Sequence, residues 1–385
     1  MNISSDDVPL DEDADIHAQR DHFLNELQEY SSKTGSTINS YRYGINKFIE
    51  WLETNQYTVD EIGVKESVKY LNWLKNESGL SDGTVESYAY VVNKLAEFYS
   101  DHNYYEGNPI TAGLNSVDMS TGRNYDTPRR NISLEQVKEA ITATDNPEER
   151  TTTVLLGKTG IRRSEASNLD LQDVNIEDER ISHCLPNPRP EIRDEPDTLF
   201  IDSNIKEGQE FRGEERRIGN KRQLDTVFPL DKELKKTLVS HISSLPPDPL
   251  NCEAEPLLRI LDNPNGKGYS GEDRPVVGRR AHPNHIAITV QKWAKKNGWY
   301  SEGEGPTTNV TPHWFRHFFT TKMIRRVDSS DFCDPNDDQV TTVRLYVKGL
   351  RGDVDDDVIQ IYDHDWGENN WKKRAYLNGI YKLYK

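Results

Sequence analysis

The sequence predicts a mainly α protein with a small β-sheet, in which a helical N-terminal domain precedes a mixed α/β domain. Apolar residues recur at three- and four-residue steps through the first part of the chain, as on one face of an amphipathic helix. An aperiodic polar stretch follows, and beyond it helical patterns alternate with short β-type segments. The expected parts are a disordered acidic tail at 1–17, a helical domain at 18–110, a linker at 111–130 and a second domain at 131–385.

Four helical patterns make up the first domain. Their apolar residues fall within 23–30, 41–52, 64–74 and 85–99. The turn-prone segments KTGS, ETNQ and ESGLSDG separate the four patterns. We therefore expect a small helical bundle whose core lies between the four apolar faces.

The second domain opens with NISLEQVKEAI, where Ser133 and Gln136 have the spacing of a capping box at a helix start. Further helical patterns lie at 148–158, from 163 onward, and at 231–243, 283–297 and 313–326. Thr198–Ile201 and Thr226–Pro229 are expected strands. The polar stretch 184–216, rich in Pro, Glu and Arg, predicts an insertion or a long hairpin loop.

The composition is strongly acidic. Asp and Glu total 65 against 48 Lys and Arg, which gives a formal net charge of −17. Phosphate binding needs Lys and Arg, so the net charge taken alone argues against a nucleic-acid partner. A local basic surface can nevertheless coexist with an acidic remainder. The same acid excess is typical of halophile proteins, and the alternative origin is an acidic mesophilic protein.

The sequence contains no pattern typical of a membrane or secreted protein. The longest unbroken apolar run, at 88–92, has five residues, whereas a transmembrane helix needs about 20. The acidic N-terminus lacks the apolar core of a secretory signal. The three cysteines lie far apart without CxxC spacing, which argues against a disulfide framework or a Cys-based zinc site. We expect a cytoplasmic protein with no membrane partner.

Four short stretches contain residue types that carry chemistry. In TGIRRSEASNLDLQDVN, Gly160 ends one helix and Arg162 enters the next. In RIGNKRQLDTVFPL, a Gly-Asn pair typical of hairpin turns lies beside Lys221 and would present this lysine at the tip. Each of these two patterns is weak when it is taken alone.

The other two stretches follow later in the chain. In TPHWFRHFFTTKMIRR, His313 and Arg316 are three residues apart, so they share one helix face and can converge on one anion. The apolar neighbours predict that this helix is partly buried, and a buried arginine needs a partner or a ligand. LRGDVDDDVIQIYDH places Tyr362 after a short turn and an apolar stretch.

Taken together and in this order, the four stretches resemble the tyrosine recombinase family, the phage-integrase-like site-specific recombinases, here of a haloarchaeal type. The resemblance covers nearly the whole chain. It implies a SAM-like core-binding domain at 18–110 and a tyrosine recombinase catalytic domain, with a basic C-terminal tail, at 131–385. The family's catalytic residues fall on Arg162, Lys221, His313, Arg316 and the nucleophile Tyr362.

One position departs from the family pattern. Asp353 stands where the family usually has a histidine before the tyrosine. Aspartate cannot donate a hydrogen bond to a phosphoryl oxygen unless it is protonated. Either Arg351, Lys348 or His364 substitutes for the missing donor, or the position is dispensable, or activity is reduced.

The resemblance implies DNA strand exchange without ATP, metal or another cofactor. Tyr362 would attack phosphorus and form a 3′-phosphotyrosine, which stores the bond energy. The two arginines would bind the non-bridging oxygens. Lys221 would protonate the departing 5′ oxygen, and His313 would exchange a proton with the tyrosine or the oxyanion.

The partners implied by the resemblance are double-stranded DNA with specific recombination sites, a homotetramer on synapsed DNA and accessory factors. Integrases, resolvases and chromosome-dimer resolvers share these motifs. Two alternatives stay open. One is a type IB topoisomerase-like enzyme that relaxes DNA without site preference, and the other is a catalytically decayed homologue that only binds DNA.

Weaker patterns indicate further DNA contacts. The candidates are Thr37, Ser40, Tyr41 and Arg42 at a helix start, together with Arg129, Arg130 and Arg222 from basic pairs. The final stretch WKKRAYLNGIYKLYK has five positive residues and no acid. It predicts a helix that docks on a neighbouring subunit or on DNA, with a solvated tail as the alternative. Its tyrosines Tyr376, Tyr381 and Tyr384 are weak alternative nucleophiles.

Overall fold

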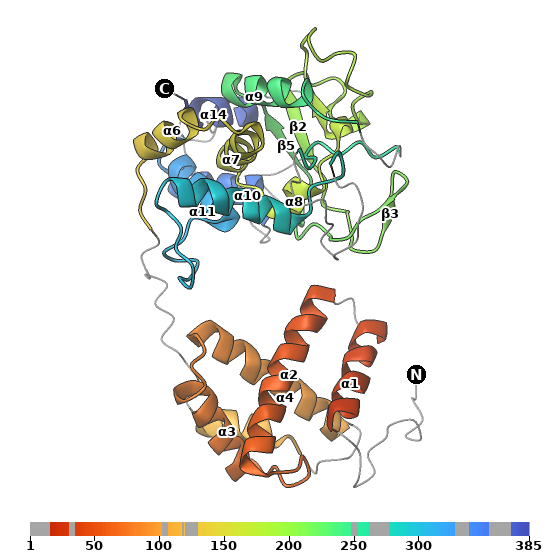
Figure 1. Cartoon of the computed structure of the whole chain (residues 1–385), viewed down its shortest axis with the longest axis vertical. Helices are drawn as coiled ribbons and strands as arrows, with labels where there is room; N and C mark the ends of the chain where they lie inside the picture. The colour runs from red at the N-terminus through yellow and green to blue at the C-terminus, as the bar shows by residue number, and fades with distance from the viewer. Residues whose placement is uncertain are drawn as a thin grey trace. The chain divides into compact units, whose positions relative to one another are not determined.

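The chain divides into two compact units, Met1–Thr127 and Pro128–Lys385, each with its own apolar core (Figure 1). The computed structural model describes residues 16–30, 35–101, 107–117, 119, 130–247, 253–261, 277–327, 339–353 and 371–384. The described residues form mainly helices with a small antiparallel sheet, as the sequence predicts. No helix within these ranges is long and apolar enough to cross a membrane.

The first unit is a helical bundle. Its helices are α1 (Ile16–Tyr30), α2 (Gly35–Asn55), α3 (Val64–Asn76), α4 (Asp82–Asp101) and α5 (Pro109–Ser116). The first four correspond to the four apolar patterns, most of whose members are buried where α2 meets α4 and where α3 meets its neighbours. Tyr70, Leu71 and Leu74 of α3 are fully buried.

Helix α5 occupies the start of the stretch 111–130, which we expected to be a linker. The side chain of Asn108 caps this helix by accepting backbone N–H groups of its first turn, and Pro109 fits that turn because it needs no N–H there. At Gly113 a Cβ would lie 2.9 Å from Cβ of Ser67, so the glycine lets α5 approach α3 closely. The linker prediction is wrong for this turn and a half of helix, because a short helix that packs through small residues shows no apolar stripe.

The second unit surrounds a central helix. Its helices are α6 (Leu134–Thr142), α7 (Pro147–Thr159), α8 (Arg163–Ser167), α9 (Lys232–Ile242), α10 (Pro283–Lys296), α11 (Pro312–Ile324), α12 (Gln339–Leu350) and α14 (Trp371–Gly379), with 3₁₀ turns η1 (Leu171–Asp173) and η2 (Pro190–Ile192). Helix α7 packs against α9, α10 and α11 and is buried over nearly its whole length. The predicted capping box of Ser133 and Gln136 is present at the start of α6.

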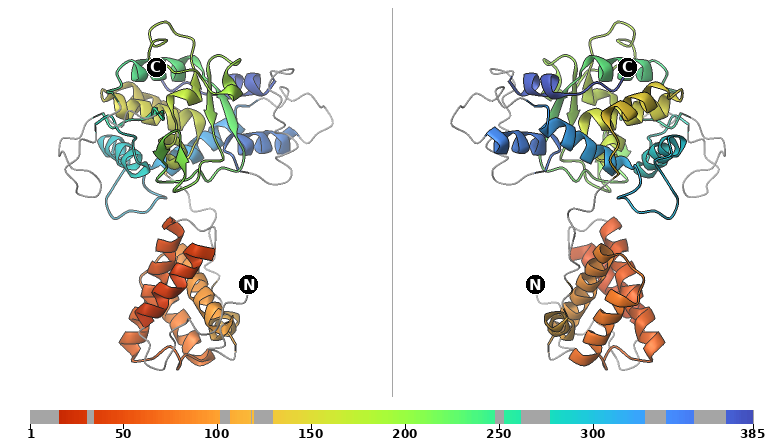
Figure 2. Two further views of the ribbon diagram at one scale, coloured as in Figure 1. Left: turned by 90° about the vertical axis from the view of Figure 1, so that its right-hand side faces the viewer. Right: turned by 90° about the vertical axis from the view of Figure 1, so that its left-hand side faces the viewer.

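The main sheet is small and antiparallel. It contains β1 (Val174–Asn175), β2 (Thr198–Ile201) and β5 (Thr226–Pro229) in the order β1-β2-β5, with Thr198 opposite Pro229. Both predicted strands are confirmed. Helices α12 and α14 lie against β5, as the two views of Figure 2 show. A separate hairpin, β3 (Glu210–Phe211) with β4 (Glu214–Glu215), lies within the polar stretch 184–216.

The end of the chain packs into the second unit. Tyr376 and Tyr381 are fully buried, and their hydroxyls donate to the backbone carbonyls of Lys158 and Gly157. The Glu233 carboxylate accepts the N–H groups that follow, including that of Leu383 at 2.7 Å. Ala375, Tyr376, Ile380, Tyr381 and Leu383 are therefore part of this unit's own core, and the expectation of a tail that docks elsewhere or stays in solvent is wrong for them. The apolar Tyr and Leu side chains, rather than the lysines, decide its position.

Candidate active site

Arg162 lies in the turn between α7 and α8. Helix α7 ends at Gly160 in the left-handed conformation, with φ 62°, and Arg162 is the extended N-cap residue of α8. Its backbone N–H donates to Oε2 of Glu165 at 2.8 Å, and Nη1 donates to Oε1 at 2.9 Å. The fully buried Glu165 carboxylate thus holds both the backbone and one side of the guanidinium of Arg162.

Arg316 is held inside the unit by α11. The Thr311 side chain and Pro312 begin this helix, and Phe315 and Phe319 on its buried face are fully enclosed. Arg316 is only 2% exposed. Its Nη1 donates to the Gly160 carbonyl at 3.0 Å. This bond links Arg316 directly to the turn that carries Arg162.

Three arginines meet at the carboxylate of Asp353. Oδ1 accepts from Nη2 of Arg162 at 2.5 Å and from Nη2 of Arg316 at 2.8 Å. Oδ2 accepts from Nη2 of Arg316 at 2.9 Å and lies 2.9 Å from Nη2 of Arg351. We call these four residues the arginine cluster. The arginines come from three separate segments, so the tertiary fold creates an anion site that already holds an anion.

The charges of the cluster are firmly set. Burial alone would raise the pKa of Asp353, but Arg316, Arg351 and Arg162 outweigh it and hold this pKa below its ordinary value. Asp353 is therefore ionised at neutral pH. Burial, together with Arg162 and Arg351, lowers the pKa of Arg316 to about 10, so this guanidinium still carries its charge at neutral pH.

Arg222 contacts the arginine cluster indirectly, through the Glu165 carboxylate that also holds Arg162. It is buried, and Nη2 donates to Oε2 of Glu165 at 3.3 Å while Nη1 donates to the Leu350 carbonyl at 3.2 Å. Burial alone would raise the pKa of Glu165. The charges of Arg222 and Arg162 lower this pKa by more than burial raises it, so it lies below its ordinary value. Our expectation of a DNA contact from Arg222 is wrong, because its guanidinium faces a buried carboxylate and a helix end rather than solvent.

The segment that carries Lys221 differs from the expected tight hairpin turn. The N–H of Asn220 donates to the Ile205 carbonyl at 2.8 Å, and a Cβ on Gly219 would lie 2.9 Å from the Glu207 nitrogen. The Gly-Asn pair therefore lies along the backbone near 205–207. Lys221 itself is exposed, and no described residue forms a hydrogen bond or ion pair with its ammonium group.

His313 lies on the exposed side of α11, one turn before Arg316. Its Nε2 is 3.0 Å from Nε2 of His317, so one imidazole donates to the other. We did not anticipate His317 from the sequence, although its spacing of four residues from His313 places both on one helix face. The pair places an exchangeable proton on the same helix as Arg316.

The remaining predicted residues have different outcomes. Tyr362, His364 and Arg129 lie outside the described residues. Tyr41 is buried in the bundle core with its ring 6.5 Å from that of Tyr90, so its expected phosphate contact is withdrawn. Arg42 forms an ion pair with Asp21 at 2.6 Å. DNA contacts from Thr37, Ser40 and Arg130 stay predictions, and the side chains of Ser40 and Arg130 are exposed. Lys348, a candidate substitute for the donor missing at Asp353, is half-buried.

The buried tyrosines of the chain end are poor nucleophiles. Burial raises the pKa of both Tyr376 and Tyr381 well above the ordinary value. Their hydroxyls already donate to backbone carbonyls. Tyr362 stays the predicted nucleophile.

A second buried charge cluster lies beside the polar stretch 184–216. Asp170 accepts from Arg212 at 2.8 Å, from Arg216 at 2.6 Å and from Arg280 at 2.6 Å. The neighbouring Asp173 pairs more loosely with arginines, and burial together with the charge of Asp170 raises its pKa to about 6. Arg212 and Arg216, which contribute to the polar composition of 184–216, thus attach this stretch to the second unit through Asp170.

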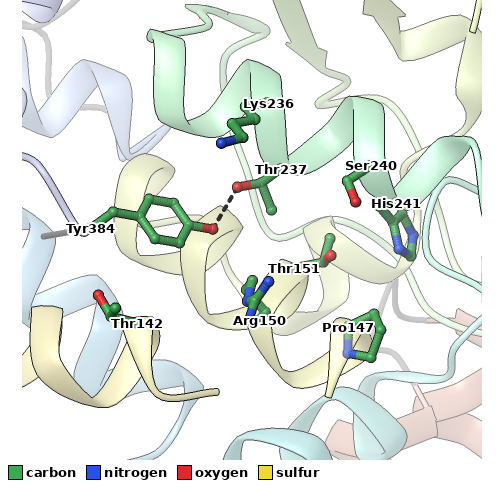
Figure 3. Close-up of a pocket in the computed structure, with 9 residues that line it drawn as sticks. All are labelled: Thr142, Pro147, Arg150, Thr151, Lys236, Thr237, Ser240, His241 and Tyr384. Atoms are coloured by element: carbon green, nitrogen blue, oxygen red, sulfur yellow. Dashed lines mark hydrogen bonds between the residues drawn. The ribbon is translucent and has the colours of Figure 1, made fainter. Parts of the chain in front are cut away.

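The structure also contains a cavity of about 320 Å³ between α7, α9 and the chain end. Figure 3 shows the side chains that line it, among them Arg150, His241 and Tyr384. The Tyr384 hydroxyl points to the Thr237 hydroxyl at 2.8 Å. None of the lining residues belongs to the arginine cluster.

Comparison with known proteins gives a family match for part of the first unit and a likeness in fold for the chain. Residues 20–102 match the family model for the phage integrase N-terminal SAM-like domain. No curated protein sequence matches the chain. A lambda integrase tetramer bound to a Holliday junction has a similar fold, with a TM-score of 0.55 and 12% identity over 92% of this chain and 79% of that one.

Two further solved structures agree. Lambda integrase as a dimer on a COC′ core site gives a TM-score of 0.53 at 13% identity, covering 89% of this chain and 96% of that one. The Tn1549 transposon integrase with transposon right end DNA gives 0.52 at 15% identity, with the same coverage. At such identities the likeness shows the fold. The first unit is a SAM-like domain, the chain is similar in fold to solved integrases, and the predicted resemblance is confirmed at the level of fold. The haloarchaeal type stays a prediction.

Proposed function

We propose that this chain is a site-specific DNA recombinase that cleaves and rejoins DNA through a 3′-phosphotyrosine intermediate. One observation carries the proposal. Arg162 and Arg316, which come from different helices, converge on the two oxygens of a single carboxylate at 2.5–2.9 Å. The non-bridging oxygens of a phosphodiester offer guanidinium groups a comparable pair of acceptors.

The charge balance supports this role. Arg162, Arg222, Arg316 and Arg351 face two carboxylates, Glu165 and Asp353. These six side chains together carry an excess of two positive charges, which matches the charge that develops on a phosphoryl group during displacement. Preorganised donors of this kind lower the barrier because they need little rearrangement as charge develops.

The chemical steps use the side chains predicted from the sequence. The Tyr362 oxygen attacks phosphorus and loses its proton to His313, and the phosphorus–oxygen bond to the 5′ side breaks. Lys221 gives its proton to the departing 5′ oxygen. The products are a 3′-phosphotyrosine and a free 5′-hydroxyl, and the same steps in reverse rejoin a strand. His317 would pass the proton received by His313 on to solvent.

The DNA partner and the assembly are proposed by analogy. The lambda and Tn1549 integrases were solved with DNA, and one lambda structure is a tetramer on a Holliday junction. We propose double-stranded recombination sites and a homotetramer for this chain as well. The exposed Ser40 of the first unit and the exposed Arg130 of the second unit would then contact DNA phosphates.

Covalent capture tests the proposal. The protein, kept in high KCl because of its acidity, is incubated with nicked duplexes of randomised sequence, and adducts that survive SDS are sequenced. Tyr362→Phe tests the nucleophile, and Tyr43→Phe, at an exposed tyrosine of the first unit, is the matched control. Circular dichroism confirms that each variant is folded.

The outcomes separate the alternatives. Adducts of defined sequence that vanish only in Tyr362→Phe support the recombinase. Adducts without sequence preference favour a topoisomerase-like relaxing enzyme. A folded protein that binds DNA and never forms an adduct favours a decayed homologue and contradicts the proposed activity.

A further inference from the structure

The carboxylate of Asp353 occupies the position at which Arg162 and Arg316 converge, and both of its oxygens are engaged. We infer that Asp353 is an autoinhibitory residue: it takes the place of the DNA phosphate, so that DNA gains the two arginines only by displacing this side chain. The inference rests on the proposed function, because it assigns the phosphate to the arginine cluster.

The Nη2 atoms through which both arginines reach Asp353 are already engaged. Arg162 uses Nη1 for Glu165 and Nη2 for Asp353. Arg316 uses Nη1 for the Gly160 carbonyl and Nη2 for Asp353 and the Arg351 carbonyl. A phosphate that approached the same Nη2 atoms would meet an ionised carboxylate within a few ångströms, and like charges repel strongly in such a poorly solvated place.

The two carboxylates of the site differ in how easily they can move. The Glu165 side chain is 0% exposed and is held by Arg162 and Arg222 together. The Asp353 side chain is 23% exposed, so water can receive it when it leaves. Glu165 is therefore a fixed support, whereas Asp353 is the anion that can be exchanged.

Hydrogen bonds hold the backbone that leads into Asp353, so a side-chain rotation is enough for the exchange. The N–H of Asp353 donates to the Lys348 carbonyl at 3.2 Å, and the preceding Gly352 carbonyl accepts from the N–H of Gln223 at 3.1 Å. Gly352 has φ 68°, and a Cβ there would overlap the Arg222 side chain. This glycine turn delivers Asp353 to the arginines, and a new χ1 rotamer can take the carboxylate away.

A permanent positioning role for Asp353 makes the opposite prediction. If the carboxylate only orients the arginines, its removal should weaken anion binding. If it competes with phosphate, its removal should strengthen anion binding. The apparent dissociation constant of a site that is open for only a fraction of the time equals the intrinsic constant divided by that fraction.

The test measures binding of inorganic phosphate by isothermal titration at constant ionic strength, on full-length chains that carry Tyr362→Phe. We expect Asp353→Asn to bind phosphate at least about tenfold more tightly than the parent, which corresponds to a site blocked in about nine of ten molecules. Asp353→Ala is measured as well, because an asparagine oxygen can still accept from the arginines. Thermal melting verifies that the variants fold.

Two controls sharpen the result. Asp145→Asn removes one negative charge at an exposed residue between α6 and α7 and should change the affinity by less than about twofold. Adding Arg162→Ala to Asp353→Asn should abolish the gain, because one of the two phosphate-binding groups is lost. Equal or weaker phosphate binding by both Asp353 variants overturns the inference.

Adduct formation separates this inference from the proposed function. With Tyr362 intact, Asp353→Asn should form adducts faster than the parent. If no chain forms an adduct but the gain in phosphate affinity persists, autoinhibition stands and the recombinase proposal fails. If the parent forms adducts and neither Asp353 variant binds phosphate more tightly, the recombinase stands and autoinhibition fails.

Discussion

Gly160 packs directly against the ring of Phe319, and this contact fixes the turn of Arg162 onto the helix of Arg316. A Cβ at Gly160 would lie 2.5 Å from Cδ1 and 2.8 Å from Cγ of Phe319. The same glycine has φ 62°, and its carbonyl accepts from Arg316. One residue thus meets a conformational, a packing and a hydrogen-bonding requirement at the candidate active site.

Gly160→Ala should destabilise the second unit by about 2–5 kcal/mol, the sum of left-handed strain and overpacking against Phe319. Urea unfolding followed by circular dichroism measures the change. Gly208→Ala is the matched control, because Gly208 has φ 76° but nothing within 4 Å of its Cβ position. It should cost only the strain, about 1–2 kcal/mol. Equal losses in the two variants would show that the Phe319 contact is unimportant.

Arg162→Ala should lower the rate of adduct formation by about 10²–10³-fold, because one donor to the developing phosphoryl charge is lost. The fold should survive, since Glu165 keeps its partner Arg222. Single-turnover adduct formation on a captured site measures the effect. Arg163→Ala removes the same charge from the exposed neighbouring residue and should keep nearly the full rate. A comparable loss in both variants would indicate a general electrostatic effect instead of a contact with phosphate.

Lys158→Ala should destabilise the second unit by about 3–5 kcal/mol, because it leaves two partly buried acids without their buried cation. The Lys158 ammonium is fully buried, lies 2.5 Å from Asp231 and 2.7 Å from Glu233, and also donates to the Tyr381 carbonyl. Thermal unfolding and the rate of proteolysis at the chain end measure the loss. Lys206→Ala, at an exposed lysine, should be nearly neutral. A stable, protease-resistant Lys158→Ala would refute this anchoring role.

Asp173→Asn should make the protein less sensitive to rising pH. The pKa of Asp173 is raised from 3.8 to about 6, so the folded state binds a proton that the unfolded state has released between these values. The free energy of unfolding of the parent therefore falls as pH rises through this window, by about 1–3 kcal/mol. Asparagine at this position cannot ionise and avoids that loss.

The measurement for Asp173 is urea unfolding of both proteins at pH 5 and pH 8. The stability of Asp173→Asn relative to the parent should increase between the two values. Because Asparagine also weakens the pairing with Arg189 and Arg212, the absolute difference at one pH does not decide the question. A pH-independent difference would contradict the raised pKa.

Local patterns predicted much of the secondary structure because their information lies within a few residues. The strands Thr198–Ile201 and Thr226–Pro229 and the capping box of Ser133 and Gln136 appear where the residue types place them. Helix α5 was missed because its contact depends on Gly113 meeting Ser67, a pairing that apolar spacing does not reveal.

For the candidate site, sequence order predicted Arg162, Lys221, His313 and Arg316, but it could not tell which charges face one another. Arg222 was expected on a DNA surface and lies buried against Glu165. Tyr41 was expected at a phosphate and lies in a core. In each case the local sequence around a charged or aromatic residue is the same whether the side chain faces solvent or packs against a distant segment.

The sequence by itself determined most of the helical segments, the strands β2 and β5, the acidic character and the residue types available for phosphoryl chemistry. These properties follow from short-range periodicity and composition. The tertiary structure alone decided that Arg162, Arg316 and Arg351 converge and that Asp353 is the anion between them. The physical reason is that a buried charge must find its counter-charge across the fold, and the chain supplies that partner from far away in sequence.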